Sequence, residues 1–199
     1  RRIPLHTIEA SRRLERTAAA ALPPHTLMQR AGLAVARLAL ALAPHARTIW
    51  IACGPGNNGG DGLEAAMHLQ RWGQHPVVTW LGDEASAPED ARASLARARS
   101  AGVAFSATPP ASLGPDDLCI DALLGLGAAR APQGRMADWL RTMQASPAPV
   151  LAVDLPSGLN AETGNFAPDS IAVDDHSTLG SCQIQAQNTL SLLSCKPGL

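Results

Sequence analysis

The sequence predicts a three-layer Rossmann-like α/β fold, with a mostly parallel sheet covered by helices on both faces. Short apolar runs alternate with segments of helical periodicity along most of the chain, which is typical of parallel sheets. A glycine-rich segment, residues 54–62, directly follows an apolar run and precedes a helical pattern. Two later apolar runs end on an aspartate, and open parallel sheets bind ligands beyond the carboxyl ends of their strands.

Helical spacing and end signals define the predicted helices. Leu27, Val35 and Leu38 recur at helical spacing, and Pro44 lies just beyond that pattern. Pro88 suits the first position of a later helix, and Gly102 suits its stop. We expect helices over residues 7–22, 27–43, 63–72, 88–100 and 133–143.

Apolar runs with β-branched or aromatic residues predict the strands. They cover residues 48–53, 76–81, 103–105, 117–121 and 149–154, with a late strand over 188–193. Residues 165–187 are polar and irregular. We interpret residues 1–199 as one domain, which could be a fragment of a longer chain.

Composition narrows the function classes. Hydrophobic residues make up 46% of the 199 residues, enough for a full core, and the net charge of −1 argues against nucleic-acid binding. The apolar run at residues 38–43 is too short to cross a membrane. Cys53 and Cys119 lie in apolar runs without CxxC spacing, so we expect buried free thiols and a cytoplasmic location. Lys196 is the only lysine. We interpret this preference for arginine over lysine as a compositional habit of the source and not as a sign of function.

The glycine segment Gly54-Pro-Gly-Asn-Asn-Gly-Gly-Asp-Gly62 predicts a phosphate-binding loop. Glycines let phosphate oxygens approach the backbone amides, and a helix starting near Gly62 would direct its free N–H groups at the anion. The alternative is a plain strand-to-helix turn, but five glycines around polar side chains exceed what a turn requires. Asp61 would repel a phosphate, so we expect it to face a sugar hydroxyl or the amides of the loop. Asp83 follows the second strand, where dinucleotide folds place a ribose-binding acid.

Acidic residues follow three of the predicted strands. Asp61, Asp121 and Asp154 should meet at one sheet edge, where like charges raise each other's pKa or recruit a cation. A lone aspartate at a strand end is more often a cap, but three together favour a site. Asn58 and Ser157 would complete an all-oxygen shell of low charge, which suits potassium better than zinc or calcium.

A second glycine-bearing segment, Gly125-Leu-Gly-Ala-Ala-Arg-Ala-Pro132, follows Asp121. It is either a flexible connector or a second grip on phosphate through backbone amides and Arg130.

Four segments in this order resemble the YjeF N-terminal domain family, the NAD(P)H-hydrate epimerases: Leu27–Gly32, Gly54–Gly62, Asp121–Gly127 and Asp154–Gly158. The final segment, Thr189–Leu199 with Lys196-Pro-Gly, also resembles the closing segment of that family. The resemblance implies a Rossmann-like fold and interconversion of the R and S forms of NADHX and NADPHX, nicotinamide cofactors hydrated at C6. NADHX and NADPHX would be substrates and not cofactors. The implied cofactor is one potassium ion per subunit, and the implied partners are a second copy in a homodimer and a fused or separate ADP/ATP-dependent dehydratase.

The resemblance also implies site residues. Asn58, Asp121 and Ser157 would hold potassium. Inversion at C6 by loss and return of water requires a carboxyl group that donates and accepts a proton; our first choice is Asp154 and our second is Asp61. The hydrated cofactor would contact Asn57, Asn58, Gly59, Gly60, Asp61, Gly125, Leu126, Gly127, Ala128, Ala129, Arg130, Ala131 and Asp154.

The sequence departs from the family pattern in places. Gln29 replaces the usual Glu, Ala128-Ala129 replaces a more polar stretch, and residues 174–187 look like an insertion or divergent loop. The rival interpretations are a non-catalytic ligand-binding or protein-interaction module of the same family and an NAD-dependent dehydrogenase.

Overall fold

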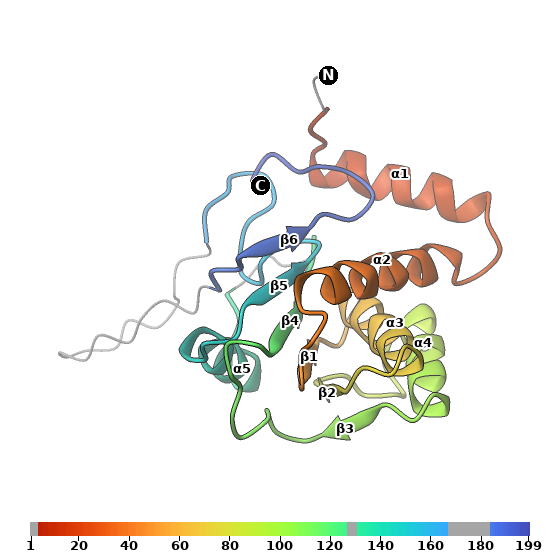
Figure 1. The fold of residues 1–199 in the computed structure, drawn as a ribbon. Helices are drawn as coiled ribbons and strands as arrows, with labels where there is room; N and C mark the ends of the chain where they lie inside the picture. The colour runs from red at the N-terminus through yellow and green to blue at the C-terminus, as the bar shows by residue number, and fades with distance from the viewer. Residues whose placement is uncertain (1–3, 127–130, 167–183) are drawn as a thin grey trace.

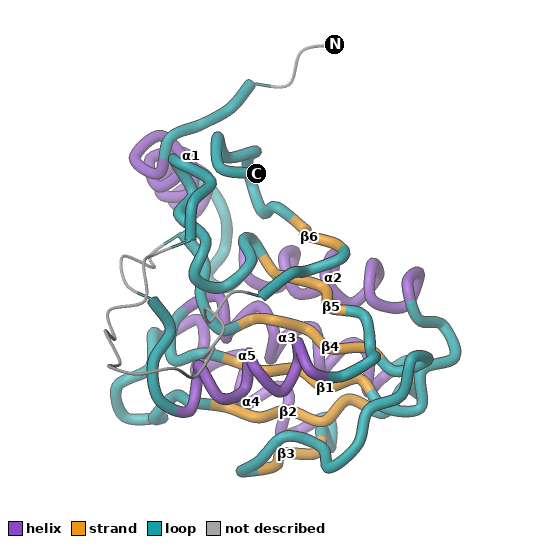
Figure 2. Tube along the Cα trace, turned by 90° about the vertical axis from the view of Figure 1, so that its left-hand side faces the viewer, coloured by secondary structure: helices purple, strands orange, loops and turns teal. Residues whose placement is uncertain are grey.

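One parallel sheet organises the residues that the computed structural model describes, which are 4–126, 131–166 and 184–199. Its strand order is β3-β2-β1-β4-β5-β6, and every neighbouring pair is parallel. Figure 2 shows the strands stacked in this order. The strands are β1 (Ile49–Cys53), β2 (Pro76–Trp80), β3 (Ala104–Ser106), β4 (Leu118–Ala122), β5 (Val150–Val153) and β6 (Asn188–Leu190).

Helices cover both faces of this sheet, as Figure 1 shows. Along β1, Ile49 and Ile51 belong to the core on the α2–α4 side, whereas Trp50 packs with Trp139 and Leu140 of α5 on the other side. This alternation is the period-2 pattern of a strand buried on both faces. The helices are α1 (Ile8–Ala20), α2 (Thr26–Leu42), α3 (Asn57–Arg71), α4 (Glu89–Ser100) and α5 (Arg135–Ala145). The predicted three-layer α/β fold is confirmed.

The start of α3 differs from the prediction. We expected a glycine loop with a helix from about Leu63, but α3 begins at Asn57. A side chain would not fit at the helical glycines: a Cβ on Gly59 would lie 2.0 Å from the Gly54 carbonyl oxygen, and one on Gly62 would lie 2.7 Å from Ala122 Cβ. The glycines after Gly56 therefore let a helix lie against the sheet, which sequence spacing alone does not reveal.

Other differences are small. The late strand is shorter than predicted, because only residues 188–190 pair with β5. Cys53 and Cys119 are buried free thiols, as expected. In the described parts of the chain, no helix combines the length and apolar character needed to cross a membrane.

Candidate functional site

A cavity of about 940 Å³ lies at the carboxyl ends of the central strands. Its wall includes residues 55–58 after β1, residues 123–126 after β4, Asp154 after β5, and residues 190–193. Helix α1 contributes Ser11 and Arg12 to the same wall. The strand order reverses direction between β1 and β4, and such switch points are where open α/β sheets bind ligands.

The N-terminus of α3 opens onto this cavity. Gly56 is the N-cap and offers no side-chain cap, and the amide of Gly60 donates to the Gly56 carbonyl at 3.2 Å. The amides of Asn57, Asn58 and Gly59 come before that first helical hydrogen bond. Asn57 and Asn58 also line the cavity, so their amides can bind an anion there. Gly59 and Gly60 themselves are buried inside the helix and do not line the cavity.

Asp61 lies one turn into α3, where its side chain contributes to the cavity wall. The residue is only 8% exposed. Burial, and next the negative charge of Asp154, raise the pKa of Asp61 well above the ordinary carboxyl range. Within the described chain, no hydrogen bond or ion pair to this carboxyl is found. Asp61 is therefore suited to carry a proton at pH values where ordinary carboxyls are ionised.

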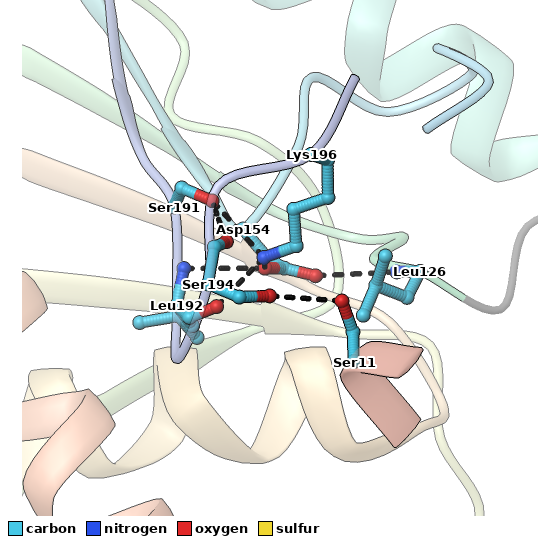
Figure 3. A network of polar contacts seen from close by, with 7 residues as sticks. All are labelled: Ser11, Leu126, Asp154, Ser191, Leu192, Ser194 and Lys196. Atoms are coloured by element: carbon cyan, nitrogen blue, oxygen red, sulfur yellow. Dashed lines mark hydrogen bonds and ion pairs between the residues drawn. The ribbon is translucent and has the colours of Figure 1, made fainter. Parts of the chain in front are cut away.

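Asp154 has a different environment, shown in Figure 3. Its backbone is left-handed, with a φ of 68°. One carboxylate oxygen, Oδ1, accepts from Lys196 Nζ at 2.5 Å and from the Leu192 amide at 3.2 Å. The other oxygen, Oδ2, accepts from the Leu126 amide at 3.3 Å. A buried lysine and two backbone amides thus bind both carboxylate oxygens.

Lys196 is a site residue that the sequence reasoning missed. It is 1% exposed although it carries a charge. The available signal was its isolation: a single lysine in an arginine-rich chain, inside Lys196-Pro-Gly near the end of the sequence. Without a structure, nothing linked it to Asp154, forty-two positions earlier.

Asp121 and Ser157 form a buried hydrogen-bonded pair beneath the cavity. Asp121 is fully buried at the end of β4, and burial raises its pKa although bonds from Ser157 act in the opposite direction. Ser157 donates its hydroxyl to Asp121 Oδ1 at 2.6 Å and its amide to Oδ2 at 2.8 Å. The Ser157 hydroxyl also accepts from the Leu124 amide at 2.9 Å. The pair joins β4 to the turn after β5.

Asn58 approaches the same region from α3. Its Nδ2 is buried and has no hydrogen-bond partner in the part of the chain that the structure describes. A Cβ built on Gly125 would lie 3.2 Å from both Asn58 Oδ1 and Asp154 Oδ2, so both side chains border the space that Gly125 leaves open. The oxygens of Asn58, Asp121 and Ser157, with nearby carbonyls, are the donor types that potassium accepts. These residues fit the expected ion.

The structure thus brings most of the predicted residues to one place. Asn57, Asn58, Asp61, Gly125, Leu126 and Asp154 line the cavity, and Asp121 and Ser157 lie beneath it without lining it. Gly127, Ala128, Ala129 and Arg130 lie outside the described residues, and Ala131 does not line the cavity.

Asp83 does not support the predicted ribose-binding role. It is exposed after β2, accepts from Ser86 Oγ at 3.2 Å within its own turn, and does not line the cavity.

Comparison with known proteins identifies several relatives. The chain is 38% identical to the Bifunctional NAD(P)H-hydrate repair enzyme Nnr of Escherichia coli over 94% of this chain, but it spans only 34% of that protein. It is 39% identical to the NAD(P)H-hydrate epimerase of Limosilactobacillus fermentum over 77% of this chain and 73% of the relative. The epimerase of Rhodopirellula baltica is 32% identical, with 82% and 68% covered.

A solved structure supports the fold. The crystal structure of the yeast protein YNL200c matches with a TM-score of 0.79 at 19% identity, covering 98% of this chain and 83% of that one. The family model described as YjeF-related protein N-terminus matches residues 24–198. The sequence resemblance is confirmed: this chain belongs to the YjeF N-terminal domain family.

Proposed function

We propose that this chain is an isomerase, an NAD(P)H-hydrate epimerase that interconverts the R and S forms of NADHX and NADPHX. One observation carries the proposal: two carboxyl groups in contrasting environments share one cavity. Asp61 is buried with a raised pKa, and Asp154 is paired with a buried lysine. Opposed environments of this kind divide acid and base roles between two carboxyls. The names of relatives at 32–39% identity support the same function.

The substrate would be held at both ends of the cavity. We expect the free amides of Asn57 and Asn58 at the N-terminus of α3 to bind the diphosphate. The hydrated nicotinamide ring would then lie near Gly125, where the absence of a side chain leaves space between Asn58 and Asp154. Binding by Gly127, Ala128, Ala129 and Arg130 remains a prediction from the resemblance, whereas Gly59 could act only through its backbone and Ala131 lacks a cavity position.

The chemistry assigns one proton step to each carboxyl. Asp61 donates a proton to the C6 hydroxyl, the C6–O bond breaks, and water leaves a cation shared between C6 and the ring nitrogen. Water then adds to the opposite face of C6 and loses a proton to the Asp154 carboxylate. Proton exchange with solvent restores both groups, and the reverse order converts S to R. This ranks Asp61 above Asp154 as the acid, reversing the order that we chose from sequence, because the Asp154 carboxylate pairs with Lys196.

A potassium ion would be held by Asn58, Asp121 and Ser157, one ion in each subunit. When bound, it would supply a fixed positive charge beside the cavity. The oxygen-rich pair of Asp121 and Ser157 supports this assignment, as does the Asn58 Oδ1 oxygen beside Gly125.

Partners and location follow from the family rather than from the site. We propose that the chain forms a homodimer and acts in the cytoplasm, where the free thiols of Cys53 and Cys119 remain reduced. A dehydratase would act on its S product, in the same chain or in a separate protein. The bifunctional relative in Escherichia coli supports the fused arrangement.

The test is conversion of purified R-NADHX to the S form, followed by chromatography against a protein-free control. We expect rapid approach to an equilibrium mixture of both epimers. Binding without conversion would support the non-catalytic family module instead. Steady hydride transfer to another substrate would support a dehydrogenase.

A further inference from the structure

Lys196 is fixed by every hydrogen bond that its ammonium group can donate. Its Nζ lies 2.5 Å from Asp154 Oδ1, 3.0 Å from Ser191 Oγ and 2.7 Å from the Leu192 carbonyl oxygen. An ammonium group has three donors, so this side chain is saturated in one orientation. Figure 3 shows it lying directly above the Asp154 carboxylate.

The same segment also holds the main chain of Asp154. The Asp154 amide donates to the Leu190 carbonyl at 2.8 Å, and the Leu192 amide donates to Asp154 Oδ1 at 3.2 Å. These bonds oppose the backbone strain of a left-handed aspartate. One carboxylate oxygen is thereby bound to the C-terminal segment, and the other faces Leu126 and the space beside Gly125.

Helix α1 braces this segment from outside. Ser11 and Ser194 are joined by a hydrogen bond of 2.8 Å between their hydroxyls. The His6 amide donates to the Cys195 carbonyl at 2.9 Å, next to Lys196. The position of the lysine therefore depends on contacts between the two ends of the described chain.

We propose that Lys196 is a positioning residue for the reaction: it holds Oδ1 of the Asp154 carboxylate, so that Oδ2 is turned toward the substrate. This inference rests on the proposed epimerase function. A buried ion pair could be purely structural, but Asp154 lines the cavity. Among the residues that the structure describes, Lys196 of the C-terminal segment forms an ion pair with Asp154, and Asp61 of α3 interacts with it electrostatically. Removing the lysine would leave the two carboxyls facing each other without a cation.

The experiment is a double-mutant cycle on R-NADHX conversion with four proteins: wild type, K196M, D154N and K196M/D154N. The control is S191A, which removes one partner of Lys196 but keeps its charge. For each protein, kcat and KM are measured, and folding is checked by circular dichroism.

If Lys196 acts through Asp154, K196M lowers kcat by about 100-fold with little change in KM, as expected when a reacting group is misplaced. In the D154N background, the same substitution changes kcat by less than about threefold, because the partner is already gone. S191A removes one of the three contacts of the Lys196 ammonium group and keeps its charge, so it lowers kcat less than K196M does.

Two results would overturn the inference: equal losses of kcat from K196M in both backgrounds, or a K196M effect confined to KM. If K196M fails to fold, K196R replaces it. Its planar group keeps the charge but cannot reproduce the three ammonium contacts, so kcat should fall with little change in KM. An undiminished kcat would contradict positioning. A wild-type protein that does not convert R-NADHX would instead remove the proposed function itself.

Discussion

At the scale of single residues, the site depends on the contrast between Asp61 and Asp154. Both are buried aspartates on one cavity wall, yet only Asp154 has a lysine beside it. The negative charge of Asp154 in turn contributes to the raised pKa of Asp61. Lys196, Asp154 and Asp61 are therefore linked: the lysine holds the Asp154 carboxylate, and the charge of Asp154 acts on Asp61.

The substitution D61N should nearly abolish epimerisation. An amide cannot supply the proton, and general acids typically contribute about 10²- to 10⁴-fold to rate. In the wild type, kcat should fall as pH rises through the raised pKa of Asp61. Steady-state rates against pH test both points. D83N is the matched control, because Asp83 is exposed and away from the cavity; an equal loss there, or full activity in D61N, would contradict the role of Asp61.

The substitution D61N should also stabilise the fold at neutral pH. A carboxyl whose pKa is raised by folding contributes stability below its unfolded pKa of about 4, and this contribution is lost as pH rises through the folded value. Asn has no such penalty, so D61N should unfold at a higher temperature than wild type near neutrality. The difference should disappear in acid. Thermal denaturation at both pH values measures it, and a lower melting temperature at neutral pH would contradict the burial argument.

At the scale of elements, the close approach of α3 to the sheet determines where the site residues of this helix lie. A Cβ on Gly59 would meet the backbone oxygen of Gly54 at 2.0 Å, whereas one on Gly56 would meet nothing within 4 Å. We therefore expect G59A to lower the free energy of unfolding by about 1–3 kcal/mol or more, as overpacking does. G56A should change it little. Chemical denaturation compares the two, and equal stabilities would mean that α3 can move outward freely.

The bond between β4 and the turn after β5 gives a second element-scale prediction. S157A removes the hydroxyl that donates to the fully buried Asp121 at 2.6 Å. Loss of a hydrogen bond to a charged group costs about 1.5–3 kcal/mol, so the free energy of unfolding should fall by that amount. If Ser157 also binds potassium, replacing potassium by lithium should lower the melting temperature of wild type more than that of S157A. Equal shifts would contradict the ion assignment.

The sequence predicts elements better than it predicts their ends. Apolar runs located the β1, β2, β4 and β5 strands to within about two residues, because buried parallel strands have a distinctive composition. The start of α3 was wrong, because Gly59, Gly60 and Gly62 resemble a loop in any local pattern. These positions are glycine because a side chain there would collide with Gly54, Met28 or Ala122. Such tertiary packing overrides helix propensity.

At the scale of the whole molecule, the sheet order assembles the site from distant segments. The order β3-β2-β1-β4-β5-β6 puts the segments after β1 and β4 side by side at the switch point. Acidic residues at strand ends could be predicted to meet there. Their contrasting environments could not, because the burial of Asp61 and the pairing of Lys196 with Asp154 depend on the path of residues 190–196 and on α1. In Figure 1 the C-terminal end lies near the start of α1.

The measurement closest to the central claim is conversion of R-NADHX in water enriched in oxygen-18. If Asp61 expels the C6 hydroxyl as water and new water adds to the opposite face, each molecule of S product formed at early times carries one solvent oxygen. Mass spectrometry of the separated epimers should show this label in the S form. Inversion without incorporation of solvent oxygen would contradict the account, since C6 would then have inverted without losing its hydroxyl.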